Sequence, residues 1–224
     1  MGKNMVYSIE RNFCKILQQK EFRKITVSEI CSKAGISRSS FYTYFESTRQ
    51  LFTDVEEYIL DDVMHILKKY DSDDVKSLLC VNTSPLFLDI CKYYHKNIEI
   101  FRALFGTYGE DEFIFIYESH MYQDFLKKAR VIGGFRFPEF IASGCAGAII
   151  AISRSWALDT DLATPEEMAG LQTAIVFRMF FSEDRFSEWM RSGSANGEKS
   201  GKEEYPESRH WNWNTSGKLF GDTV

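Results

Sequence analysis

The sequence predicts an all-α protein, with a small N-terminal three-helix domain of the helix-turn-helix type followed by a larger helical domain. Three observations support this prediction. Apolar residues recur at three- and four-residue steps through most of the chain, which is the period of a helix. Residues typical of helix starts and stops separate these stretches. No segment alternates apolar and polar residues in the manner of a strand, and no internal repeat stands out.

The chain of 224 residues divides into three parts by composition. Residues 1–50, here called the head, contain the short helices. Residues 51–190, here called the body, contain the long ones. Residues 191–224 are rich in Gly, Ser and charge and lack periodicity, so we expect a flexible tail there. Trp211 and Trp213 are unusual residues for such a tail.

The first two helices of the head are predicted by periodicity and by a capping signal. The first has one apolar face, made of Val6, Ile9, Phe13, Ile16 and Leu17. The second begins after Thr26, a good N-cap residue, and Glu29 three residues later completes a capping-box pattern.

A tight turn and a third helix follow. Gly35 can adopt the left-handed conformation that ends a helix, and Ser37 can cap the next one, which we expect to include Phe41 and Phe45. Apolar residues at this spacing can form the small core that holds two helices at a fixed angle. These residues are Ile30, Ile36, Phe41 and Phe45.

Five longer helices are predicted in the body. Their ranges are 47–70, 86–105, 111–132, 138–159 and 164–181. The last begins with Thr164-Pro-Glu-Glu, which is a strong helix start signal. Residues 113–117 have the composition of a strand, but they lie inside a longer helical pattern, and we therefore predict a helix there.

Charge is distributed unevenly between the two ends of the chain. Residues 1–52 hold nine Lys or Arg and four Glu, a net charge of +5, which leaves −10 on the remainder of a chain whose total is −5. A basic head on an acidic body is expected if only the head contacts phosphate.

The cysteines and the apolar runs predict a cytoplasmic protein with no membrane segment. The five cysteines are odd in number, widely spaced and contain no CxxC pair, which fits a reducing compartment. The longest apolar stretch, residues 141–152, is shorter than the roughly 20 residues that span a bilayer.

The third helix leaves a polar surface that is unusual unless it contacts a partner. Arg38, Ser39, Ser40, Thr43 and Tyr44 face outward when the apolar residues form the core. Arginine can pair with a phosphate or with a guanine edge, and hydroxyl groups can bind either phosphate or base. A solvated surface is the alternative for each of these residues taken singly.

The head closely resembles the amino-terminal domain of the TetR/AcrR family of bacterial transcriptional regulators over residues 5–52. The matching residues are Ile25-Thr26-Val27, Ile30, Ala34-Gly35-Ile36-Ser37, Phe41-Tyr42, Tyr44-Phe45, Ser47 and Leu51. The resemblance implies a homodimeric repressor that binds a palindromic operator in double-stranded DNA and is released by a small-molecule effector. It also implies that Tyr42 contacts phosphate. The expected DNA-contacting residues are Lys24, Thr26, Ser37, Arg38, Ser39, Ser40, Tyr42, Thr43, Tyr44, Thr48 and Arg49.

One position departs from the family pattern. The family usually has Lys directly after the residue equivalent to Ser47, and here Thr48 occupies that place with Arg49 next. Either Arg49 replaces the missing charge, or the protein makes one fewer phosphate contact. In the second case the slope of the logarithm of the binding constant against the logarithm of salt concentration would be smaller by about 0.9.

The body is expected to supply dimerisation and signal recognition. Small residues on the predicted helix 138–159 permit close helix approach, namely Gly144, Gly147, Ala148 and Ala151, and the resemblance implies that the last two body helices pair across a two-fold axis. These residues could instead pack within one subunit. A weaker resemblance, from Phe140 to the Thr164-Pro-Glu-Glu start, is to a carboxy-terminal domain common in Gram-positive members. The expected effector-pocket residues are Tyr94, Phe101, Tyr117 and Trp156.

No enzyme signature accompanies these features. The four histidines, His65, His95, His120 and His210, have no metal-ligand spacing, and no phosphate-binding or nucleophile motif occurs. We therefore expect no catalysis, no metal and no cofactor. Two alternatives remain open: a DNA-binding regulator whose body docks a protein partner, and a helical binding protein whose head has lost DNA affinity.

Overall fold

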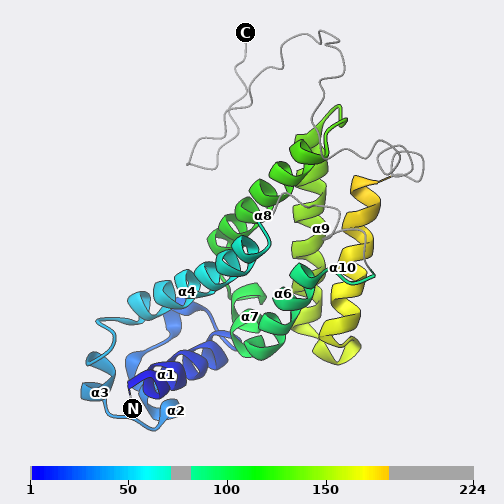
Figure 1. Ribbon diagram of the computed structural model, residues 1–224. Coiled ribbons are helices and arrows are strands. Elements are labelled where there is room, and N and C mark those ends of the chain that lie inside the picture. Colours follow the sequence, from blue (N-terminus) through cyan, green and yellow to red (C-terminus); the bar gives the residue numbers. More distant parts are fainter. Residues whose placement is uncertain (1, 72–81, 182–224) are drawn as a thin grey trace, which may run out of the picture. The chain divides into compact units, whose positions relative to one another are not determined.

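The computed structural model describes residues 2–71 and 82–181, and all regular structure in those ranges is helical (Figure 1). The head contains α1 (Gly2–Leu17), the short 3-10 helix η1 (Phe22–Lys24), α2 (Val27–Ala34) and α3 (Arg38–Tyr42). The body contains α4 (Thr48–Lys69), α6 (Pro85–Lys96), α7 (Ile98–Phe105), α8 (Asp111–Ile132), α9 (Pro138–Leu158), η2 (Thr160–Leu162) and α10 (Pro165–Phe180). The all-α prediction is confirmed. The predicted tail, with Trp211 and Trp213, lies outside the described residues.

The core of the head is built as its apolar pattern predicts. Ile9, Phe13 and Leu17 of α1 have no exposed surface, and Ile30 and Phe41 are equally buried. Phe45 is 3% exposed, whereas Ile36 is only half-buried. The ring of Phe13 lies 5.6 Å from that of Phe52 in α4, and Phe22 lies 5.0 Å from Phe52, so the start of α4 is part of the same core.

Local capping explains where α2 begins and ends. The Thr26 hydroxyl accepts a hydrogen bond from the Glu29 N–H at 3.3 Å, and Gly35 ends the helix with a left-handed φ of 68°. The reciprocal half of the predicted capping box does not form, because the Glu29 carboxylate instead accepts from Lys20 Nζ at 2.6 Å. This pairing holds the pKa of Glu29 below its usual value. The box does form completely between Thr164 and Glu167 at the start of α10.

The third helix is shorter than predicted. It ends at Tyr42, so the prediction that it includes Phe45 is wrong. The Thr43 hydroxyl donates to the Ser39 carbonyl at 3.1 Å, and such side-chain bonds compete with the regular helix ladder. The Phe45 N–H still donates to the Phe41 carbonyl at 3.0 Å, which keeps the Phe45 ring in the core.

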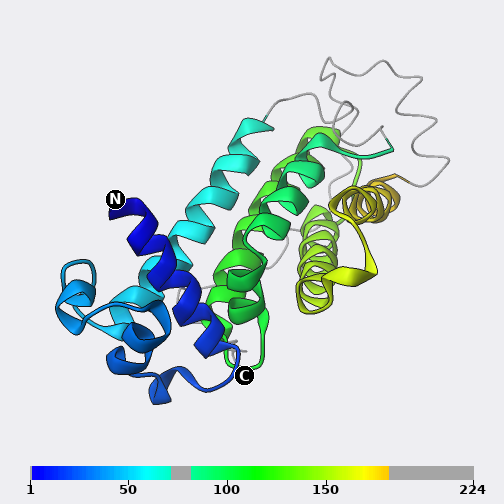
Figure 2. The same ribbon diagram turned by 90° about the horizontal axis from the view of Figure 1, so that it is seen from below.

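The body is a bundle of long helices (Figures 1 and 2). α8 packs along α9, α6 packs on α10, and α4 contacts both α6 and α8, while α7 lies between α1 and α9. The prediction of one helix over 86–105 is wrong. Asn97 adopts φ −108° and ψ 27°, and its side-chain amide donates to the Tyr93 carbonyl at 3.1 Å, so α6 ends there and α7 begins. The other four predicted body helices are observed within one residue at each end.

One helix of the described residues, α9, is long and apolar enough by length and composition to cross a membrane. Of its most apolar window, 44% is buried within the protein. It packs against α7, α8 and α10, and its buried side chains include Ile149 and Trp156. α9 is therefore partly buried by its neighbouring helices.

Candidate nucleic-acid interface

The start of α3 is a cluster of hydroxyl groups. The Ser37 hydroxyl accepts a hydrogen bond from the Ser40 N–H at 3.0 Å, which caps the helix. Its oxygen also lies 2.8 Å from the hydroxyl oxygens of both Ser39 and Ser40. Each of these hydroxyls keeps donor or acceptor capacity for a further partner. Because the cluster is at the surface, a phosphate or a base edge could reach it.

The larger side chains of α3 and the turn after it are exposed. Tyr42 is 51% exposed and Tyr44 is 37% exposed, although Phe41 beside them has no exposed surface. Arg38 is exposed and forms no ion pair with another residue of the described ranges. Phe41 is therefore buried, while the cation of Arg38 and the phenols of Tyr42 and Tyr44 remain at the surface of α3 and the turn after it.

The start of α2 provides a second group of predicted contacts. Thr26 and Lys24 are both exposed there, and the free N–H groups of a helix N-terminus favour anions. Lys24 Nζ lies 3.1 Å from the Glu21 carboxylate, with both side chains more than half exposed. An exposed pair of this kind contributes little stability, so Lys24 can exchange Glu21 for another anion.

Thr48 and Arg49 belong to α4, and Arg49 pairs with residues outside α3. Thr48 is the first residue of α4 and is half-buried. Arg49 Nη1 is 2.9 and 3.0 Å from the two carboxylate oxygens of Glu110, just before α8, and its guanidinium lies 4.1 Å from the centre of the Phe22 ring. Sequence reasoning missed Glu110 and Phe22 as partners, because neither stands near Arg49 in the sequence.

Three of the four predicted pocket residues come together in the body. Tyr94 and Tyr117 share a hydrogen bond between their hydroxyls, and the Phe101 ring centre is 4.0 Å from that of Tyr94. All three are at most 1% exposed, and burial raises the pKa of Tyr117, so its hydroxyl stays neutral. Trp156 is equally buried but has other partners: its indole N–H donates to the Ala163 carbonyl at 2.9 Å, and its ring stacks on His95.

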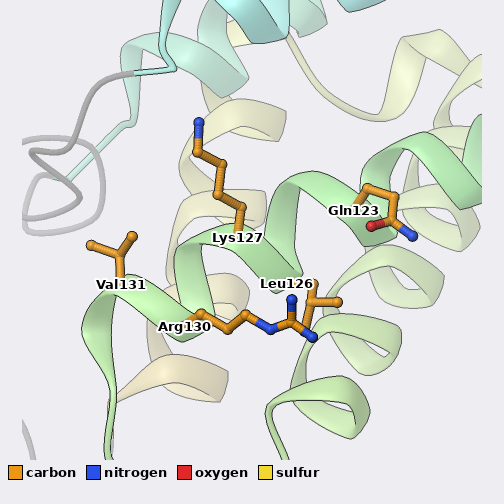
Figure 3. A pocket seen from close by; sticks show the side chains of 5 residues that line it. All are labelled: Gln123, Leu126, Lys127, Arg130 and Val131. Atoms are coloured by element: carbon orange, nitrogen blue, oxygen red, sulfur yellow. The ribbon is translucent and has the colours of Figure 1, made fainter. Parts of the chain in front are cut away.

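A hollow that was not predicted lies on the outer side of α8 (Figure 3). It has a volume of about 350 Å³ and is lined by Gln123, Leu126, Lys127, Arg130 and Val131. In Figure 3 the Lys127 side chain extends away from the Arg130 guanidinium. Lys127 pairs with Asp71, and Arg130 lies 3.6 Å from Glu139, so internal carboxylates already engage both cations.

The predicted dimer residues lie on a partly exposed side of α9. Gly144 and Ala151 are exposed, whereas Gly147 and Ala148 are half-buried. A Cβ added at Gly144 would meet only the Met179 sulfur at 3.9 Å, which is ordinary contact. Packing within one subunit therefore does not require glycine at this position.

Large apolar side chains are exposed on α9 and on the neighbouring helix α10. On α9 and α10, Phe140 is 73% exposed, Leu171 is 48% exposed and Met179 is 37% exposed. Such side chains rarely gather at a surface that faces only water.

Comparison with known proteins gives two family matches. The description "Bacterial regulatory proteins, tetR family" matches residues 14–55, and "Transcriptional regulator C-terminal region" matches residues 81–177. No curated protein matches the chain at a significant level.

Several solved structures share the fold. A tetR-family transcriptional regulator from Streptomyces coelicolor has 14% identity and a TM-score of 0.58, covering 87% of this chain and 90% of its own. NalD, described as the secondary repressor of the MexAB-OprM multidrug efflux pump in Pseudomonas aeruginosa, has 19% identity and a TM-score of 0.56, covering 82% and 100%. The dihydroxyacetone kinase operon activator DhaS has 20% identity and a TM-score of 0.52, covering 79% and 96%.

Proposed function

The chain belongs to the tetR family of bacterial regulatory proteins, a family of transcriptional regulators with a DNA-binding N-terminal domain, and we propose that its α3 reads an operator sequence. The observation that carries the proposal is the surface of α3, where Arg38, Tyr42 and the hydroxyl cluster around Ser37 are exposed on a buried apolar core. The net charge of +5 on residues 1–52 supports the same role.

We assign different tasks to the exposed residues. Arg38 and Ser39 contact base edges, because they stand in the first turn of the helix that enters the major groove. The remaining predicted contacts, apart from Thr48 and Arg49, bind phosphate and position the head. These are Lys24, Thr26, Ser37, Ser40, Tyr42, Thr43 and Tyr44. Thr48, the first residue of α4, joins them through its hydroxyl.

The proposal includes a homodimer. A recognition helix as short as α3, with five residues, reads only a few base pairs, so two copies on a palindrome are needed for specificity. The face of α9 and α10 that contains Gly144, Ala151, Phe140 and Leu171 supports this pairing, because it is apolar and exposed in one subunit. An operator-binding dimer acts where the chromosome is, so we place it in the cytoplasm.

We further propose that the protein is a repressor and that a small molecule releases it from DNA. The hydroxyl pair of Tyr94 and Tyr117 beside Phe101 would bind a mainly apolar molecule with one polar group. These rings pack closely together, so the effector would have to favour a state in which they separate. One structural relative is described as a repressor and another as an activator.

The test uses DNA from upstream of the protein's own gene and the full chain. We expect specific retention that falls steeply with salt, and a loss of about 1–3 kcal/mol in Arg38→Ala that relaxes preference at one base position. Tyr42→Phe should weaken binding to all sequences about equally. Lys68→Ala, which removes one exposed cation from the last turn of α4, is the matched control and should bind as the unmodified protein does. Salt-insensitive binding, or equal losses in Arg38→Ala and Lys68→Ala, would contradict the proposal.

Small compounds are then screened for release of the complex. Release by a compound, lost in Tyr117→Phe but not in Lys68→Ala, is the expected result. Release only by added protein would favour a docked protein partner instead.

A further inference from the structure

We propose that Arg49 is a positioning residue, which fixes the head on the body through Glu110 and thereby restricts the operator half-site spacing that the dimer accepts. The inference rests on the proposed function and gives Arg49 a role that involves no contact with DNA. It replaces the expectation that Arg49 binds phosphate.

The Arg49 side chain joins the core of the head to the start of α8. Its guanidinium lies 4.1 Å from the ring centre of Phe22 and 5.7 Å from that of Phe52, and both rings belong to the aromatic core of the head. Its Nη1 group donates to both carboxylate oxygens of Glu110. Stacking on two rings while pairing with a carboxylate uses the planar shape of arginine, which lysine does not have.

The Glu110 side chain pairs with Arg49 and does not cap its own helix. It occupies the N-cap position of α8, but its side chain makes no capping hydrogen bond, although a carboxylate there could accept one. α8 in turn packs along α9, the helix with the predicted dimer face. A continuous path therefore runs from α4 through Arg49 and Glu110 to α8 and α9.

A second polar contact joins head and body at a different place. The side-chain amide of Gln18, just after α1, donates to the Glu99 carbonyl at 2.9 Å and lies 3.3 Å from the Glu99 carboxylate, at the start of α7. Two separate attachment points restrict rotation of one part on another, whereas a single point would leave a hinge. Of these two polar contacts, removal of Arg49 leaves only that of Gln18 with Glu99, beside the continuous helix α4.

The charges around Glu110 add a reason why Arg49 stays in place. Glu56, about two turns after Arg49 on the same side of α4, has a buried carboxylate oxygen with no hydrogen-bond partner in the described ranges. Burial, together with the charge of Glu110, raises its pKa to about 7, and Arg49 opposes that rise while Glu112 and Glu57 add to it. If Arg49 moved to a phosphate, these carboxylates would face one another without a cation.

The consequence for DNA follows from the dimer geometry. When the heads are held, the distance between the two recognition helices is fixed, and only one half-site spacing fits. When Arg49 no longer holds them, each head can turn, so neighbouring spacings become acceptable. Coupling between distant sites is typically worth about 5- to 150-fold in affinity, and we expect discrimination against spacings one base pair longer or shorter to fall by at least about fivefold.

The experiment measures affinity of the full chain for a series of palindromes that differ only in half-site spacing. Arg49→Ala and Glu110→Gln should each broaden the spacing profile, and Lys68→Ala should leave it unchanged. If Arg49 instead contacts phosphate, Arg49→Ala weakens binding to palindromes of every spacing alike and lowers the salt slope of binding by about 0.9. In that case Glu110→Gln frees Arg49 and strengthens binding. That result would overturn the inference.

A second measurement does not depend on DNA. Hydrogen exchange should become faster at the first hydrogen-bonded N–H groups of both α4 and α8 in Arg49→Ala, although 61 residues separate Arg49 from Glu110. Faster exchange at α4 alone would mean a local role and would also overturn the inference. If the unmodified protein retains no DNA, the proposed function fails, and hydrogen exchange still decides whether Arg49 holds the head to the body.

Discussion

Glu10 provides a prediction whose size follows from the structure. It lies on α1 among apolar residues and is only 8% exposed, and its carboxylate is close enough to that of Asp54 for their charges to interact. Burial first, and the Asp54 charge second, raise the pKa of Glu10 from 4.5 to about 7. Ionised Glu10 therefore destabilises the folded state, whereas protonated Glu10 does not.

The sign follows from proton linkage. Between pH 4.5 and about 7 the folded protein binds the Glu10 proton more tightly than the unfolded chain, so stability falls as pH rises through this window. Each pKa unit corresponds to about 1.36 kcal/mol, and the full loss from Glu10 is about 3 kcal/mol as an upper value. Glu10→Gln removes the ionisable group at nearly the same size. It should leave stability unchanged near pH 4 and raise it by up to about 3 kcal/mol at pH 8.

The assay is urea denaturation of the full chain at both pH values and one protein concentration, because the stability of a dimer depends on concentration. Asp61→Asn removes a similar charge from an exposed position on α4 and serves as the control, with an expected change of less than about 0.5 kcal/mol at either pH. The reasoning is refuted if Glu10→Gln retains the pH dependence of the unmodified protein, or if it destabilises the protein at pH 8.

Three further substitutions test separate parts of the structure. Ser37→Ala removes the cap of α3 and should cost about 1 kcal/mol in urea denaturation and weaken operator binding; unchanged stability would argue against the cap. Tyr94→Phe leaves the Tyr117 hydroxyl buried without its partner and should lower the free energy of unfolding by about 1–3 kcal/mol. The double change Tyr94→Phe/Tyr117→Phe should recover most of that stability, and additive losses would contradict this. Ala151→Glu should convert the dimer to monomer in sedimentation, whereas Ser119→Glu on the exposed side of α8 should not, and equal behaviour of the two would exclude this face.

Local signals in the sequence predicted local structure well. Thr26, Gly35 and Ser37 each act within four residues of their own position, and each adopts the predicted cap or turn. The period of apolar residues likewise predicted the course of α8, where residues of strand-like composition are helical, with Phe113 and Tyr117 buried against Phe105 of α7. Such features depend on neighbours in the sequence and can be read from it.

The errors come from side-chain hydrogen bonds and ion pairs, some local and some to distant residues, that compete with the predicted pattern. Asn97 interrupts a strongly helical pattern through its own side-chain hydrogen bond to the Tyr93 carbonyl. The Glu29 carboxylate pairs with Lys20 and does not complete the predicted capping box. The contact of Arg49 with Glu110 is the clearest case, since nothing near either residue predicts that they meet. The exposed surface of α3 could be predicted, but its attachment to the body could not.

Selection of DNA from a random pool by the full chain tests the central claim most directly. If α3 reads an operator as one of two copies in a dimer, the selected sequences should converge on a palindrome whose half-sites lie about one helical turn apart, and Arg38→Ala should lose preference at one position in each half. A pool that shows no enriched sequence, or one without two-fold symmetry, would contradict the account.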